Sequence, residues 1–132
     1  MTTRRRYATE TTIANRGVRL NGRDPRMAHD ISPEELRTRL AENRPLVLLD
    51  VRDEWETRLC RLESSTHIPI EEIEFRTAEL PPDDEIVVYC HHGIRSAAVA
   101  DYLRGQGFAK AVNLAGGLDL WARAVDPSMR RY

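Results

Sequence analysis

A cysteine stands where the sequence changes from strand-forming to helix-forming residues. The segment 86–89, Ile-Val-Val-Tyr, predicts a strand, and Cys90 follows it directly. A six-residue loop from Cys90 to Arg95 then leads into a segment, 96–104, that predicts a helix. At such a junction, free backbone N–H groups and the helix dipole favour an anion. Cys90 is therefore the candidate nucleophile, because the thiolate is the reactive form of cysteine.

The residues after Cys90 are of types that can stabilise such an anion. Gly93 allows backbone angles that let several N–H groups converge on one point. Arg95 supplies a cation that can close the ring or pair with an acceptor, and the Ser96 hydroxyl can cap the helix or donate toward the sulfur. The alternative is a buried structural cysteine, which this combination of residue types disfavours. The candidate active-site loop comprises His91, His92, Gly93, Ile94, Arg95 and Ser96.

Three interpretations are open for His91 and His92. As metal ligands they would have to converge, but adjacent histidines are expected to point apart and no second Cys/His cluster completes a site. We therefore predict no metal. One imidazole can instead lower the pKa of Cys90 as a cation, or donate a proton. We favour the third interpretation, in which each residue contributes a backbone N–H and its ring faces solvent or a partner.

Earlier elements place charged residues at the expected position of a site. A serine followed by a proline predicts the start of a helix over 33–41. The run Leu-Val-Leu-Leu at 46–49 is typical of a strand buried on both faces. Asp50 and Arg52 follow this strand, at the carboxyl end where open α/β sheets place their sites.

The remaining segments continue the alternation of strands and helices. Strands alternating with helices predict an α/β fold with a mainly parallel sheet. Cys60 has no anion-stabilising turn around it, so we predict no catalytic role for it. The last residues, after Pro127, are predicted to be loose. The other predicted elements are a helix over 54–62 with Trp55 packed inward, a helix over 70–80, a strand over 111–114, and a helix with Leu118 and Trp121.

Composition narrows the function classes. The 132 residues predict one domain, and a net charge of -1 does not suggest a nucleic-acid binder. No apolar run approaches the roughly 20 residues of a membrane-spanning helix. Two cysteines do not make a secreted disulfide framework, so we expect a reducing, cytoplasmic setting. Residues 1–28, with seven arginines in the first 26, are predicted to be a poorly ordered extension of a domain over 29–132.

Several ordered motifs together resemble the single-domain rhodanese-like sulfurtransferase family, over residues 30 to 132. They are Leu-Leu-Asp-Val-Arg at 48–52 with Glu56 downstream, His-Ile-Pro at 67–69, Val-Val-Tyr-Cys-His-His-Gly-Ile-Arg-Ser at 87–96 and Asn-Leu-Ala-Gly-Gly-Leu-Asp-Leu-Trp at 113–121. The resemblance implies a rhodanese-like fold, with a central, mainly parallel five-stranded sheet flanked by helices on both faces. It implies that Cys90 holds sulfur as a persulfide, and that Asp50 and Arg52 brace the loop. Glu63-Ser64 replaces the family's usual Pro-Gly, which puts that local turn in doubt.

The resemblance also implies a reaction. A sulfane sulfur would pass from a donor to Cys90 and on to an acceptor by double displacement, with no cofactor. The expected donor is thiosulfate or a persulfide, and the acceptor is a thiol, cyanide or a sulfur-carrier protein; no nucleic acid or membrane partner is expected. A sulfur-relay or regulatory module with low turnover is the alternative. Phosphatase or arsenate reductase activity is less favoured, because related phosphatases have seven residues from cysteine to arginine and this chain has six.

Overall fold

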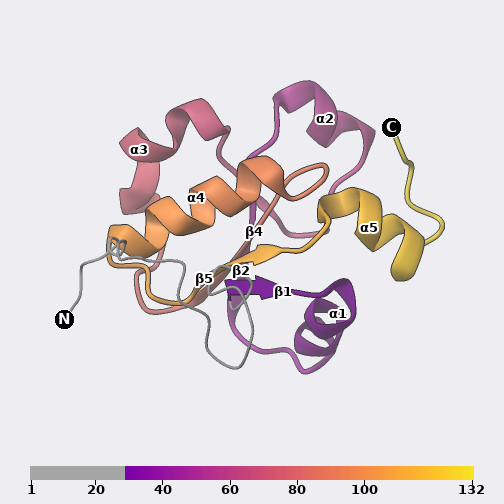
Figure 1. The fold of residues 1–132 in the computed structure, drawn as a ribbon, viewed down its shortest axis with the longest axis horizontal. Helices are drawn as coiled ribbons and strands as arrows, with labels where there is room; N and C mark the ends of the chain where they lie inside the picture. The colour runs from indigo at the N-terminus through magenta and orange to yellow at the C-terminus, as the bar shows by residue number, and fades with distance from the viewer. Residues whose placement is uncertain (1–28) are drawn as a thin grey trace, which may run out of the picture.

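The computed structural model describes residues 29–132, which form a five-stranded parallel sheet with helices on both faces (Figure 1). The predicted α/β class and five-stranded parallel sheet are confirmed. The predicted N-terminal extension, residues 1–28, lies outside the described residues. The strand order is β1-β5-β4-β2-β3. The strands are β1 (Asp30–Ile31), β2 (Leu46–Asp50), β3 (Thr66–His67), β4 (Glu85–Tyr89) and β5 (Ala111–Leu114).

Helices cover the sheet as two layers. On one face, Leu36 of α1 and Leu118 of α5 belong to one buried apolar cluster. On the other face, Ile73 of α3 and Val99 of α4 belong to a second cluster. Figure 1 shows α1 and α3 on opposite sides of the strands. The helices are α1 (Pro33–Ala41), α2 (Glu54–Leu59), α3 (Ile73–Arg76), α4 (Ile94–Gly105) and α5 (Gly117–Ala124).

The central strand β4 is buried on both faces. Val88 and Cys90 belong to the cluster beneath α4, whereas Val87 and Tyr89 belong to the cluster beneath α5. Apolar side chains are therefore needed from Ile86 to Tyr89, and this explains the uninterrupted apolar run in the sequence. The alternation also turns the Cys90 side chain toward α4.

Strand register brings two chain reversals together. β2 pairs with β4 so that Asp50 lies opposite Tyr89. The segment that begins at Val51 and the loop that begins at Cys90 therefore leave the same carboxyl edge of the sheet, side by side. This is the edge at which parallel α/β sheets place their functional sites.

The prediction that Trp55 packs inward is wrong. The predicted helix over 54–62 ends at Leu59, with Cys60 in an extended conformation. In this short helix Glu56 turns inward and is 3% exposed, whereas Trp55 is 58% exposed. The reason is an ion pair that Glu56 makes, described below, which sets the rotation of the helix and leaves its neighbour outside.

Two other helix predictions need correction. The segment predicted as one helix over 70–80 consists of a 3₁₀ turn, Ile70–Glu72, then α3, then a 3₁₀ turn, Thr77–Glu79. These tighter turns change the helical phase, so that Ile73 and Leu80 both reach the core. α4 begins two residues before the predicted start, at Ile94. None of the helices in residues 29–132 has the length and apolar character needed to cross a membrane.

Candidate active site

The sulfur of Cys90 lies in a ring of backbone donors. The side chain is 1% exposed, and its Sγ accepts N–H groups from Gly93 at 3.2 Å and Ser96 at 3.3 Å. Gly93 caps α4 with a φ of 93°, a left-handed conformation that suits glycine. Because both donors belong to the loop and the first turn of α4, the site favours a negative charge on sulfur.

The Ser96 hydroxyl connects the sulfur to a buried polar chain. Its Oγ lies 3.2 Å from Cys90 Sγ and donates to Asn113 Oδ1 at 2.5 Å. The amide of Asn113 in turn donates to Asp30 Oδ1 at 3.2 Å. With the hydroxyl hydrogen committed to Asn113, Ser96 offers a lone pair to the thiol hydrogen. Ser96 therefore contacts the sulfur but does not cap the helix.

The first turn of α5 holds the loop through backbone hydrogen bonds. Leu118 N–H donates to the Cys90 carbonyl at 2.9 Å, and Asp119 N–H donates to the His91 carbonyl at 3.0 Å. These bonds direct the loop carbonyls away from the sulfur and leave loop N–H groups to face it. Gly117 has a φ of 63°, and a Cβ there would lie 2.4 Å from the His91 carbonyl oxygen. Only glycine allows this close approach.

Arg95 is held by a carboxylate that lies 39 residues earlier in the chain. Its two terminal nitrogens donate to Glu56 Oε1 and Oε2, each at 2.9 Å. This paired hydrogen bond lowers the pKa of Glu56 to about 2, although burial opposes the shift. The same bond raises the pKa of Arg95, and the nearby Cys90 contributes a smaller increase. Arg95 therefore pairs with an acceptor beside the ring, as one of the two predicted alternatives had it.

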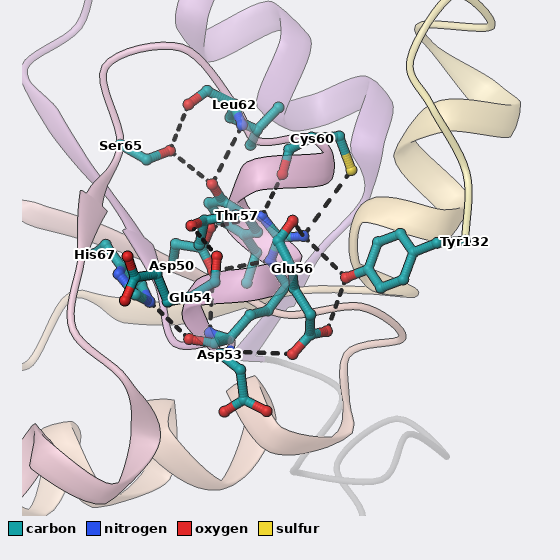
Figure 2. Close-up of polar contacts among 12 residues, drawn as sticks. Asp50, Asp53, Glu54, Glu56, Thr57, Cys60, Leu62, Ser65, His67 and Tyr132 are labelled. Atoms are coloured by element: carbon teal, nitrogen blue, oxygen red, sulfur yellow. Dashed lines mark hydrogen bonds and ion pairs between the residues drawn. The ribbon is translucent and has the colours of Figure 1, made fainter.

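Asp50 and Arg52 form a buried pair beside α2. Arg52 donates to Asp50 Oδ1 at 2.9 Å and Oδ2 at 2.7 Å, and to the Cys60 carbonyl at 2.6 Å. Burial would lower the pKa of Arg52, but its bonds to Asp50 outweigh this and the pKa is raised. Figure 2 shows how the network continues to Tyr132 and Glu56. The Asp50–Arg52 pair is therefore connected to Arg95 by hydrogen bonds through Tyr132 and Glu56.

The prediction that the adjacent histidines point apart is wrong. The rings of His91 and His92 stack with their centroids 3.9 Å apart, and Tyr132 stacks on His91 at 3.8 Å. The Nε2 atom of His91 is buried and has no hydrogen-bond partner. Burial, followed by the neighbouring His92, lowers the pKa of His91. A partly buried, neutral imidazole therefore follows Cys90.

This stack also brings histidine nitrogens near a carboxylate. In residues 29–132, His91, His92 and Asp119 form one group whose potential ligand atoms lie within 4.8 Å of one another. Asp119 is already paired with Arg123 at 3.3 Å and Arg131 at 3.1 Å. Two guanidinium groups oppose a further cation at this carboxylate. The absence of a functional metal stays our prediction.

Three residues of the site did not emerge from the sequence as site residues. For Glu56 the sequence carries two signals, its place downstream of Leu-Leu-Asp-Val-Arg and the capping box that it forms with Asp53 at the start of α2. Asn113 also had one, as a polar residue inside a short apolar strand. Tyr132 had none, and the prediction that the last residues are loose is wrong for it. Its hydroxyl bonds to Arg52 at 2.9 Å and to Glu56 at 2.8 Å.

The chain is similar to known proteins over most of its described part. The family model of the rhodanese-like domain matches residues 32–124. A sulfurtransferase of Allochromatium vinosum is 35% identical over 97 residues, which cover 74% of this chain and 91% of that protein. The human single-domain sulfurtransferase TSTD1 superposes with a TM-score of 0.66 at 27% identity, covering 73% of this chain and 96% of that one.

A longer relative contains the same domain. The probable adenylyltransferase/sulfurtransferase MoeZ of Mycobacterium tuberculosis is 38% identical over 104 residues, which cover 77% of this chain. They cover only 26% of that relative. The match therefore concerns about a quarter of MoeZ and leaves its remaining length unmatched.

Proposed function

This chain belongs to the rhodanese-like domain family and is a rhodanese-type sulfurtransferase, and we propose that it transfers sulfur through a persulfide on Cys90. One observation carries the role of Cys90. Its sulfur accepts two backbone N–H groups at the start of α4, the arrangement that favours a thiolate and a persulfide anion. Cys60, the other free cysteine, has no such donors and instead lies 4.0 Å from an Arg52 nitrogen.

The reaction is a double displacement. With thiosulfate as donor, the Cys90 thiolate attacks the outer sulfur, an S–S bond forms, and the S–S bond of thiosulfate breaks as sulfite leaves. An acceptor such as cyanide then attacks the outer persulfide sulfur and leaves as thiocyanate. The Cys90 thiolate is regenerated with no net oxidation of the protein. The Gly93 and Ser96 N–H groups stabilise the anion in both halves.

Residues around the ring set which donor fits. Arg95 is the loop's permanent cation, and Glu56 compensates its charge. Thiosulfate carries two negative charges, so we propose a persulfide or a protein as the cellular donor. A thiol or a sulfur-carrier protein is the proposed acceptor. The reaction needs no cofactor, and a reducing cytoplasm would keep Cys90 available.

A low-turnover sulfur relay that serves a protein partner is the second candidate. Ile94, the first residue of α4, is 79% exposed, and Trp55, next to Glu56, is 58% exposed. Exposed apolar side chains beside a buried nucleophile suit contact with a partner. A phosphatase is less favoured, because Arg95 is engaged by Glu56 beside a short ring.

Mass spectrometry of the intact protein tests the proposal. After treatment with thiosulfate or a low-molecular-weight persulfide, the wild type should gain the mass of one sulfur atom and lose it on addition of cyanide. Cys90→Ser should gain none, whereas Cys60→Ser should behave as the wild type. A wild type without the adduct, or an adduct retained in Cys90→Ser, would exclude this function. An adduct with slow turnover would favour the relay.

A further inference from the structure

Tyr132 lies between two ion pairs. Its hydroxyl accepts from Arg52 Nη1 at 2.9 Å and donates to Glu56 Oε1 at 2.8 Å. On one side Arg52 pairs with Asp50, and on the other Glu56 pairs with Arg95. Figure 2 shows Tyr132 reaching across from the end of the chain to Glu56. One hydroxyl thus links a buried pair to the pair beside the nucleophile.

The Glu56 carboxylate has little freedom in this arrangement. Oε1 accepts from Tyr132 and from Arg95, and Oε2 accepts from Arg95 and from the Asp53 N–H at 3.0 Å. Each oxygen therefore has two donors, which fix the plane of the carboxylate. A guanidinium bound in the fork geometry follows that plane, so the orientation of Glu56 sets that of Arg95. Without the Tyr132 hydroxyl, Oε1 would have one donor.

The Tyr132 ring makes separate contacts. It stacks on His91 with the rings 10° from parallel, and it meets Trp55 edge-on with the centroids 5.8 Å apart. His91 directly follows the nucleophile. The ring therefore contacts the loop at the residue next to Cys90, while the hydroxyl acts on Glu56 of α2. The two functions of the side chain can be separated, because phenylalanine keeps the ring and removes the hydroxyl.

We propose that Tyr132 is a positioning residue of the sulfur-transfer site, which orients Arg95 through Glu56 and holds His91 through ring stacking. The inference rests on the proposed function, because it gives Arg95 the role of interacting with the anionic reagents of sulfur transfer. Arg95 is 35% exposed and lies near enough to Cys90 for the cysteine to contribute to its raised pKa, so its orientation should affect how a negatively charged reagent approaches the sulfur. A neutral reagent should be affected much less.

The test compares Tyr132→Phe with Tyr102→Phe in two assays. Tyr102, on α4, is 37% exposed and serves as the matched control. The first assay is the rate of Cys90 alkylation by anionic iodoacetate relative to neutral iodoacetamide, measured by site-resolved mass spectrometry. The second is kcat/KM for sulfur transfer from thiosulfate to cyanide. Thermal unfolding reports how much of each variant is folded.

In Tyr132→Phe we expect the iodoacetate-to-iodoacetamide ratio to fall about threefold and kcat/KM to fall by about three- to tenfold, since the hydrogen bonds to both Arg52 and Glu56 are lost and their effect reaches Arg95 only through Glu56. Tyr102→Phe should match the wild type in both assays. A residue that only anchors the chain end would change both alkylation rates alike and leave their ratio unaltered. An unaltered ratio in folded Tyr132→Phe would overturn the inference.

The two proposals fail in different ways. If the wild type transfers no sulfur but the alkylation ratio still falls in Tyr132→Phe, the proposed function is excluded, while the role of Tyr132 in orienting Arg95 stands. A wild type that transfers sulfur, with Tyr132→Phe equal to Tyr102→Phe in both assays, would exclude only the positioning role. Tyr132→Ala should lower kcat/KM further, because the stack on His91 is lost as well.

Discussion

Replacing Glu56 with glutamine should destabilise the protein in a pH-dependent way. The substitution keeps the shape of the side chain and removes the charge that faces Arg95. Glu56 is 3% exposed and accepts from two side chains, Arg95 and Tyr132. Glutamine cannot accept all of these bonds, because one end of its amide is a donor. The lost hydrogen bonds should therefore lower the stability of the protein and leave the Arg95 side chain less ordered.

The pKa of Glu56 gives the magnitude. It lies at about 2 in the folded protein, against an ordinary value of 4.5. A gap of about 2.5 pH units corresponds to about 3 kcal/mol at about 1.36 kcal/mol per unit. Arg95 is 35% exposed, so solvent screening reduces the contribution. We expect Glu56→Gln to lower the free energy of unfolding by about 2 kcal/mol at pH 7.

The sign of the pH dependence follows from the lowered pKa. Because the unfolded chain takes up the proton first, the contribution is complete above pH 4.5 and is lost as the pH falls toward 2. The difference between the wild type and Glu56→Gln should narrow from about 2 kcal/mol at pH 7 to about 1 kcal/mol at pH 3.5. Urea unfolding, followed by circular dichroism at both pH values, measures it.

A glutamate on the same helix provides the control. Glu54 is 71% exposed and pairs with Arg58 one turn later. Glu54→Gln should change the free energy of unfolding by less than about 0.5 kcal/mol, with little pH dependence. The reasoning would be refuted if Glu56→Gln were as stable as Glu54→Gln at pH 7. It would also be refuted if the difference from the wild type were the same at both pH values.

Three further predictions concern the loop. Gly117→Ala should destabilise the protein by about 3 kcal/mol or more in urea unfolding, because its Cβ would meet the His91 carbonyl oxygen. Gly105→Ala, with no atom within 4 Å of its Cβ, should be neutral or slightly stabilising, and a Gly117→Ala variant of equal stability would contradict the geometry. The pKa of His91 in an NMR titration should lie below its ordinary value of 6.5, and a value at or above 6.5 would mean that the ring is not buried against Tyr132. Treatment with a chelator should leave sulfur transfer unchanged; lost activity that a divalent metal restores, and Asp119→Asn abolishes, would establish a metal at the His91, His92 and Asp119 group.

Much of the fold can be predicted from the sequence because its signals are local. The apolar run of β4, the glycine after Cys90 and the helical segment that follows each reflect the preference of a few neighbouring residues. The order of strands and helices then restricts the sheet to a parallel arrangement. The position of Cys90 at the carboxyl edge of that sheet follows from the same order.

The sequence predictions are wrong where the surroundings of a residue come from distant parts of the chain. Trp55 has the apolar character of a core residue, yet the burial of Glu56 turns it outward. The sequence predicts that the rings of His91 and His92 diverge, but the two rings stack on one another and Tyr132 stacks on His91. No local pattern reports such a contact, because the chain has many carboxylates and aromatic rings and the folded packing selects among them.

Sequence alone predicts Cys90 as the candidate nucleophile, its place between a strand and a helix, and the anion-stabilising character of the loop. These depend on short-range backbone geometry, which residue types dictate. Tertiary structure alone decided which carboxylate receives Arg95, 39 residues away, and which residue bonds to Arg52, 80 residues away. Those pairings require the sheet and both helical layers to be in place first. The backbone donors to the sulfur therefore come from neighbouring residues, whereas the charged groups around it are paired with residues far away in the sequence.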